Sequence, residues 1–114
     1  TNRFSIYGLK NKSVGCVSGI ANPAAFEKML VAAGLNLKKA FRFPDHHNYS
    51  GADIQGIIST CKQMDINQVI TTEKDIVKLR NYLTAECSVQ FYALVIRLSV
   101  KENETFFKRI SRIY

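Results

Sequence analysis

The chain has 114 residues, a length that suits one domain with a core of its own. Apolar residues make up 46% of the sequence, which argues against intrinsic disorder. Lysine and arginine number 16 and aspartate and glutamate number 9, so the net charge is +7. This surplus favours an anionic partner, which could be nucleic acid, a phosphorylated metabolite or an anionic membrane surface.

Signals for targeting and for disulfides are weak. The longest apolar run, Phe91–Ile96, is far too short to span a membrane, and the first residues lack the charged-then-apolar pattern of a secretion signal. Cys16, Cys61 and Cys87 have neither the number nor the spacing of a disulfide framework or a C-x-x-C metal knuckle. We therefore expect reduced thiols in a cytoplasmic protein, with Cys16 and Cys61 in the core.

The N-terminal residues predict an arm followed by a buried strand. Residues 1–13, with the alternating segment Phe4–Tyr7, are expected to form an N-terminal arm or interdomain strand. Residues 14–114 are expected to form a single α/β domain. The short apolar run Val14–Val17 is typical of a buried strand.

A helix and a second strand follow. Asn22 before Pro23 is a strong helix start, and Gly34 is a suitable end. The apolar face of this helix recurs at helical spacing at Phe26, Met29, Leu30 and Ala33. Leu37–Phe43 is predicted as the next strand, which Pro44 ends.

Two further helices begin with capping patterns. Ser50 and Asp53 fit a capping box, in which Asp replaces the usual Glu. After the short strand Val69–Thr71, Thr72 can cap a helix that has Asp75 three residues later. The apolar positions of these two helices are Ile54, Ile57, Ile58 and Cys61, then Ile76, Leu79 and Leu83.

The C-terminal part predicts a long strand and a last helix. Val89–Val100 is dense in β-branched and aromatic residues. The last helix is expected to turn its apolar residues inward, namely Phe106, Phe107, Ile110 and Ile113. Its basic residues, Lys108, Arg109 and Arg112, are expected on its other faces.

This alternation predicts a three-layer α/β sandwich around a mostly parallel sheet of about four to five strands, with helices on both faces. Ligands of such sheets bind at the carboxyl ends of the strands. Three loops, 18–22, 45–49 and 71–75, should meet there, and they carry most of the reactive polar residues.

Gly19–Pro23 lies where a phosphate-binding loop would lie, and the helix start could attract an anion. The sequence lacks G-x-x-x-x-G-K-[ST] and G-x-G-x-x-G, however, so spacing favours a tight turn with a helix cap.

Asp45-His46-His47 is the sharpest candidate for chemistry, because a histidine at a sheet edge can act as acid, base or metal ligand. A solvated loop in which Asp45 caps backbone amides is the structural alternative. Adjacent histidines clamp a metal poorly and no third ligand has suitable spacing, so no metal site is expected.

Thr72–Asp75 opens a helix, and a capping role explains most of it. Lys74 opposes the helix dipole there, which hints at an anion or a carboxylate nearby. Basic clusters at residues 38–42 and 108–112 lack the interleaved aromatic residues of a nucleic-acid platform, so no nucleic acid is expected. Solvated faces or attraction to anionic lipid explain them.

The sequence resembles the tetraacyldisaccharide 4′-kinases, the lipid A kinases of Gram-negative bacteria. The resemblance runs from Val14 onward and corresponds to the C-terminal portion of such an enzyme. The matching residues are Val14–Pro23 (VGCVSGIANP), Phe26, Phe43–His47 (FPDHH), Asp53 and Thr71–Lys78 (TTEKDIVK). Ala21 departs from the family pattern, which usually has glycine there.

The resemblance implies a transferase that uses ATP and Mg²⁺ to phosphorylate the 4′-hydroxyl of tetraacyldisaccharide 1-phosphate, at the cytoplasmic face of the inner membrane. ATP and metal would be bound by an N-terminal P-loop domain, the partner of this chain. His46 matches the family's functional histidine, which supports the catalytic aspartate, and Asp45 is expected to order its loop. The substrate or phosphate site would include Gly19, Asn22, Thr72, Glu73, Lys74 and Asp75.

Without the P-loop domain, the chain alone should not turn over ATP, and no cofactor is expected in it. The alternative is a free-standing α/β module that binds a phosphorylated ligand or a protein partner. A P-loop unit fused upstream in the gene would favour the kinase.

Overall fold

A computed structural model describes residues 2–84, 87–98 and 106–112. The strands in these ranges are β1 (Asn2–Ser5), β2 (Ser13–Ser18), β3 (Asn36–Arg42), β4 (Gln68–Thr72), β5 (Gln90–Leu98) and β6 (Phe106–Arg112). The helices are α1 (Pro23–Ala32), α2 (Gly51–Gln63) and α3 (Glu73–Leu79), with 3-10 turns η1 (Ile6–Leu9) and η2 (Arg80–Tyr82).

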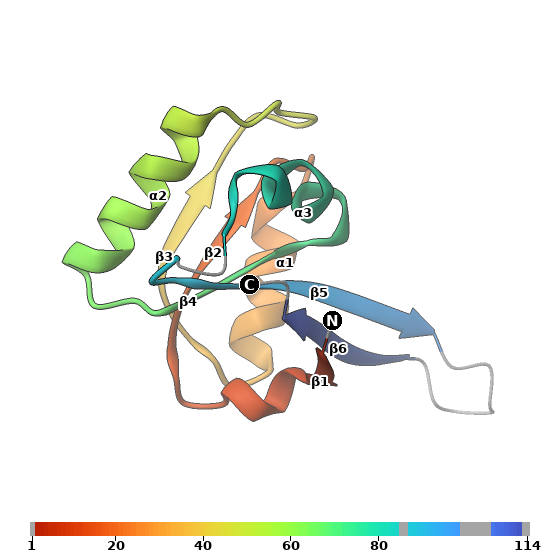
Figure 1. Cartoon of the computed structure of the whole chain (residues 1–114). Helices are drawn as coiled ribbons and strands as arrows, with labels where there is room; N and C mark the ends of the chain where they lie inside the picture. Colours follow the sequence, from red (N-terminus) through yellow and green to blue (C-terminus); the bar gives the residue numbers. More distant parts are fainter. Residues whose placement is uncertain (1, 85–86, 99–105, 113–114) are drawn as a thin grey trace.

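The strands form one sheet in the order β1-β6-β5-β4-β2-β3 (Figure 1). Strands β3, β2, β4 and β5 run parallel, whereas β6 is antiparallel to both β5 and β1. The chain moves from β2 outward to β3, then crosses back to β4 and on to β5. The carboxyl ends of β2 and β4 therefore flank the switch point of the sheet, where ligands of open α/β sheets bind.

Helices cover both faces of the parallel part of the sheet. Because strand-to-strand crossovers are right-handed, the reversal of direction puts α1 on one face and α2 and α3 on the other. Figure 1 shows this arrangement, with α1 behind the sheet. The predicted three-layer α/β sandwich is confirmed.

Each face has its own apolar core. On one face, α2 and α3 pack on the sheet through residues that include Ile57, Leu79 and Phe91, all at most 1% exposed. On the other face, α1 packs through residues that include Leu30 and Ile70, both fully buried. The sheet is therefore desolvated on both sides, which explains why β2 and β4 are short apolar runs.

The helix starts agree with the predicted caps. Asn22 Oδ1 accepts the amide of Ala25 at 3.2 Å, and Pro23 is the first helical residue of α1. Ser50 and Asp53 form a complete capping box at α2, with reciprocal bonds of 3.0 and 3.2 Å. Each cap satisfies amides that the first helical turn leaves without partners.

The predicted C-terminal helix is wrong. Phe106–Arg112 is strand β6, which is hydrogen-bonded on one side to β5 and on the other to β1. An apolar pattern this short fits both a helix and a strand, and pairing with the preceding β5 and the distant β1 decides the outcome. Ile113 lies outside the described residues.

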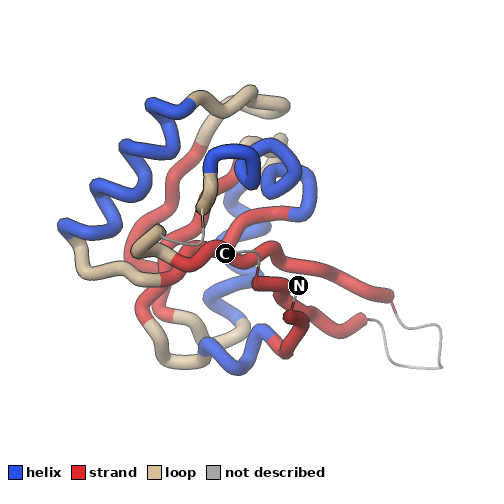
Figure 2. The backbone as a smooth tube through the Cα atoms, viewed as in Figure 1, coloured by secondary structure: helices blue, strands red, loops and turns tan. Residues whose placement is uncertain are grey.

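Other boundaries differ less. The sheet has six strands in the described ranges, more than the four to five expected, because β1 and β6 extend it. The helix expected to reach Leu83 ends at Leu79 and continues as η2. The long strand is β5, and the expected residues 99–100 lie outside the described ranges. Figure 2 shows β5 and β6 reaching past the helices.

The arm before β2 is attached to the sheet. Its strand β1 pairs with β6, and Ile6 and Leu9 in η1 are buried in the core on the α1 side. Among the described residues, no helix is long and apolar enough to cross a membrane.

The cysteines lie as predicted. Cys16 and Cys61 are buried and Cys87 is half-buried, all as free thiols. Burial raises the pKa of Cys16 to about 12 and that of Cys61 to about 11, which leaves both thiols protonated and unreactive near neutral pH.

Candidate functional site

The three loops expected to meet at the carboxyl edge of the sheet do meet. The backbone N–H of Gly19, in the first loop, donates to Asp75 Oδ2 at 3.1 Å. Tyr49, at the end of the second loop, donates its hydroxyl to Asp75 Oδ1 at 3.0 Å. Asp75 itself belongs to the first turn of α3, so one carboxylate joins segments that are up to 56 residues apart.

Asp75 is the centre of this edge. Its side chain is 2% exposed, and its Oδ2 also accepts the Thr72 hydroxyl at 2.7 Å. Thr72 Oγ1 in turn accepts the Asp75 amide at 3.1 Å, as the predicted cap requires. A buried carboxylate is costly unless donors surround it, and three donors from three loops do so here. Both carboxylate oxygens are thereby engaged within the chain.

Gly19 lies against this carboxylate, and a side chain there would be tightly packed. A Cβ there would meet Tyr49 Oη at 3.0 Å, the carbonyl oxygen of Pro44 at 3.1 Å and Asp75 Oδ1 at 3.3 Å. The close approach of three loops at this point therefore favours glycine. Because the Gly19 amide is bonded to Asp75, this N–H is not directed at a ligand.

His46 protrudes from a strained turn. The amide of His47 donates to the Pro44 carbonyl at 3.0 Å, which closes a four-residue turn with His46 at its third position. The φ of His46 is +62°, the left-handed conformation that a type II turn requires and that favours glycine or asparagine. The His46 amide donates to the Gly19 carbonyl at 3.1 Å. The imidazole of His46 is 78% exposed, so its ring is available to a partner.

His47 faces inward, in contrast to His46. Its Nε2 lies 2.8 Å from Asp53 Oδ2, and its ring stacks on Phe43 and meets the edge of Tyr49. The hydrogen bond from His47, followed by the Ser50 amide, holds the pKa of Asp53 below its usual range. An ionised carboxylate only accepts hydrogen bonds, so His47 Nε2 carries the hydrogen.

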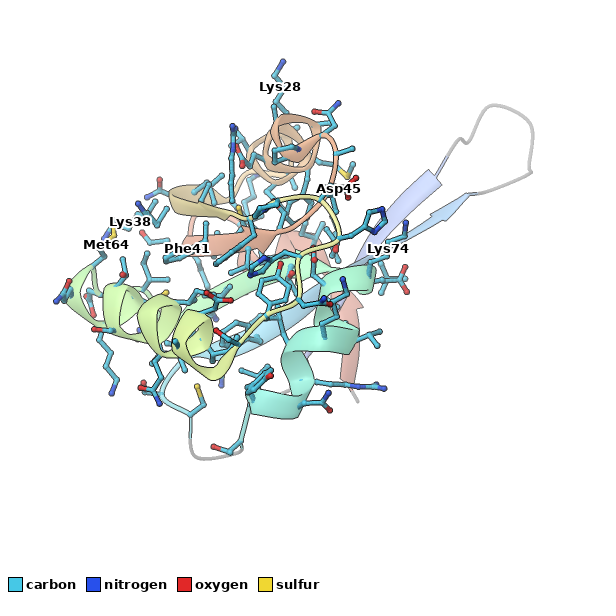
Figure 3. The ribbon with its side chains drawn as sticks, turned by 90° about the horizontal axis from the view of Figure 1, so that it is seen from above. Lys28, Lys38, Phe41, Asp45, Met64 and Lys74 are labelled. Atoms are coloured by element: carbon cyan, nitrogen blue, oxygen red, sulfur yellow. The ribbon has the colours of Figure 1, made fainter. Side chains whose placement is uncertain are left out.

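An open cavity of about 500 Å³ lies beside these loops. Its lining combines the charged side chains of Asp45, Lys74 and Lys78 with the ring of His46 and an apolar wall that includes Val77. Figure 3 looks onto this edge and shows Asp45 and Lys74 on the same side of the molecule. Cationic, anionic and imidazole groups on one rim suit a polar, charged ligand.

The other predicted site residues are placed as follows. Asn22 caps α1 and Thr72 caps α3, while Glu73 is exposed beside Lys74. Asp45 makes a long contact of 3.7 Å with His46 Nε2, beyond hydrogen-bond distance. In the described ranges, no three His, Cys, Asp or Glu side chains gather as a metal site.

The basic cluster at residues 38–42 is partly engaged. Lys38 Nζ donates to the Met64 carbonyl at 3.0 Å, and Arg42 forms a bidentate pair with Glu27 at 2.7 and 2.8 Å. Arg42 thereby lowers the pKa of Glu27 and fastens β3 to α1. The side chains at residues 108–112 lie outside those described.

Sequence reasoning missed three parts of the site: the Tyr49 hydroxyl, the bond between His47 and Asp53, and Lys78. Lys78 Nζ donates to the His47 carbonyl at 3.0 Å, from one turn beyond Lys74. A lysine four residues after Lys74, on the same face of α3, was the available signal.

The fold and the site define an α/β domain that presents an exposed imidazole and charged side chains at the switch point of its sheet, the layout of a ligand-binding or catalytic domain. The family model described as tetraacyldisaccharide-1-P 4′-kinase matches residues 2–114. The chain belongs to this family.

Individual relatives agree. The chain is 35% identical over 104 residues to a tetraacyldisaccharide 4′-kinase of Desulfatibacillum aliphaticivorans, which covers 91% of this chain and 28% of the relative. It is 40% identical over 72 residues to the protein of that name in Bdellovibrio bacteriovorus, covering 63% of this chain and 21% of the relative. It is 35% identical over 104 residues to the protein of that name in Rickettsia canadensis. This match covers 88% of this chain and 30% of the relative.

The chain therefore spans between a fifth and a third of the length of the curated relatives it matches. No solved structure matches it.

The close approach at Gly19 gives a first prediction. Gly19→Ala should lower the free energy of unfolding by about 1–3 kcal/mol, because the new Cβ must displace a backbone carbonyl as well as two bonded side chains. The matched control is Gly56→Ala in α2, where nothing lies within 4 Å of the new atom. This control should raise stability by about 1 kcal/mol. Equal effects of the two variants in urea unfolding would contradict the packing argument.

The second prediction concerns alkaline pH. Burial, and then the charge and hydrogen bond of Asp75, raise the pKa of Tyr49 well above its usual range. Above about pH 10 an unfolded tyrosine loses its proton, whereas folded Tyr49 keeps it, so unfolding releases a proton. This group therefore costs about 1.4 kcal/mol of stability for each pH unit above pH 10.

Tyr49→Phe should remove this contribution. The variant should be about 1 kcal/mol less stable than the parent at pH 7, since it loses a hydrogen bond to a carboxylate. Its stability should then fall less than that of the parent between pH 9 and pH 11.5, as measured by urea unfolding. Tyr82→Phe, which removes an exposed hydroxyl, is the matched control. Parallel alkaline losses in the parent and Tyr49→Phe would refute the assignment.

Proposed function

We propose that this chain is the C-terminal domain of a tetraacyldisaccharide 4′-kinase, which transfers the γ-phosphate of ATP to the 4′-hydroxyl of tetraacyldisaccharide 1-phosphate in lipid A biosynthesis. The observation that carries the proposal is the family match over residues 2–114. The relatives support it, because each is named a tetraacyldisaccharide 4′-kinase.

In this proposal the N-terminal P-loop domain binds ATP and Mg²⁺, which supply the transferred group and neutralise its charge. The residues of this chain fit that task poorly. The Gly19 amide and both oxygens of Asp75 are used in bonds within the chain, so neither is directed at a phosphate or a cation. The chain instead closes the site from the acceptor side.

His46 is the residue of this chain that takes part in the proton transfer. Its exposed imidazole is placed to hydrogen-bond the catalytic carboxylate of the N-terminal domain. That bond would orient the carboxylate and ease removal of the proton from the sugar hydroxyl. Asp45 orders the turn before His46, and Lys74 meets a phosphate group or pairs with a carboxylate across the cavity.

We also propose that the enzyme works as a peripheral protein at the cytoplasmic face of the inner membrane of a Gram-negative bacterium. The net charge of +7 supports attraction to the anionic lipid headgroups of the membrane that contains the lipid substrate.

The third prediction tests the role of His46 in the full-length protein. His46→Asn should lower kcat by about 100-fold, because the shorter amide side chain cannot hold the catalytic carboxylate in the position that the imidazole gives it, while KM for the lipid changes little. The fold should not suffer, because asparagine tolerates the left-handed φ of residue 46 better than histidine does. Steady-state kinetics and thermal unfolding measure both effects.

Asp65→Asn is the matched control. Asp65 is an exposed residue with a φ of +58°, and it follows α2, away from the cavity lining. This variant should keep the kcat of the parent. A change confined to KM in His46→Asn would instead point to substrate binding, and an unchanged kcat would end the proposed role of His46.

A further inference from the structure

We propose that Lys78, His47 and Asp53 form a clamp that positions His46 for the reaction. The inference rests on the proposed function, in which His46 takes part in the proton transfer. The clamp residues are positioning residues, because they hold the chain next to His46 and are not expected to touch the reacting atoms. They come from α3, from the loop after β3 and from α2, respectively.

The first half of the clamp holds the ring of His47. Its Nε2 donates to Asp53 Oδ2 at 2.8 Å, and the same oxygen accepts the Ser50 amide at 3.0 Å. The capping box fixes the Asp53 carboxylate at the start of α2. The hydrogen bond from His47 therefore ties the loop after β3 to a fixed point on this helix. Phe43 stacks on the ring of His47, with centroids 4.8 Å apart.

The second half holds the backbone of His47. Lys78 is half-buried, and its Nζ donates to the His47 carbonyl at 3.0 Å. The His47 amide is bonded to the Pro44 carbonyl, also at 3.0 Å. Both polar groups of the peptide backbone at residue 47, and the ring as well, are therefore fixed by separate partners.

His46 depends on this arrangement because its own side chain is not held. Its imidazole is 78% exposed and lies 3.7 Å from Asp45, beyond hydrogen-bond distance. Its direction is set by the backbone, which has the unfavourable φ of +62°. Release of His47 would let this turn relax, and a shift of about 1 Å in a reacting group can cost about 100-fold in rate.

Lys78→Met tests the clamp in the full-length protein. Methionine keeps an unbranched side chain of similar length and removes the donor to the His47 carbonyl. We expect kcat to fall by about tenfold while KM for the lipid stays within twofold. Lys78→Arg keeps a donor and should restore most of the rate. Lys62→Met, at an exposed lysine of α2, should leave kcat unchanged.

His47→Phe is the second variant and does not depend on Lys78. Phenylalanine keeps a ring that can stack on Phe43 and removes the bond to Asp53. It should lower kcat in the same way as Lys78→Met, with a similar KM. If Lys78→Met proves too unstable to purify, this variant decides the question.

A double-mutant cycle separates positioning from a merely structural role. If Lys78 acts through His46, Lys78→Met should have no further effect on kcat in the His46→Asn background. The same tenfold loss in both backgrounds would overturn the clamp, and so would an unchanged kcat in both Lys78→Met and His47→Phe. A normal kcat in His46→Asn would instead overturn the proposed role of His46, and the clamp with it.

Discussion

The carboxylate of Asp75 is the constraint on which the rest of this site depends. It is 2% exposed, so it has lost most of its hydration, and hydrogen bonds must replace that water. The replacements come from the Gly19 amide, the Tyr49 hydroxyl and the Thr72 hydroxyl, which lie on three different segments. None of these segments can move away without leaving a buried charge short of a donor, so the three loops behave as one body.

Two helices use the same local motif to hold the same loop. Ser50 with Asp53 and Thr72 with Asp75 are both caps in which an acid occupies the third helical position. In each case the acid also reaches out of its helix, Asp53 to His47 and Asp75 to Tyr49. The loop that carries His46 is therefore fastened to α2 at its middle, through His47, and to α3 near its end, through Tyr49.

This double use explains what the sequence could and could not predict. The spacing of Ser50 and Asp53 indicates a cap, because both partners lie within one helical turn. That Asp53 also binds a histidine ring, or that Asp75 accepts from Tyr49, depends on how the helices pack, and no local pattern contains that information.

The same limit applies to the prediction of the fold. The patterns predict strands β2, β3 and β4 and all three α-helices near their observed positions. They predict a helix for β6, which is a strand because it pairs with the distant β1 as well as with β5.

The contrast between His46 and His47 follows from what each must contact. A residue that reaches a group on another domain has to be exposed, and an exposed side chain gains little orientation from packing. His46 meets this condition, with 78% of its side chain open to solvent. Its orientation must then come from the backbone, and a left-handed backbone at a histidine persists only where neighbours enforce it. In the proposed clamp, the inward-facing ring of His47, 2.8 Å from Asp53, supplies that enforcement one residue away. In the proposed clamp, the half-buried histidine is thus the condition under which the exposed one can be directed at a partner.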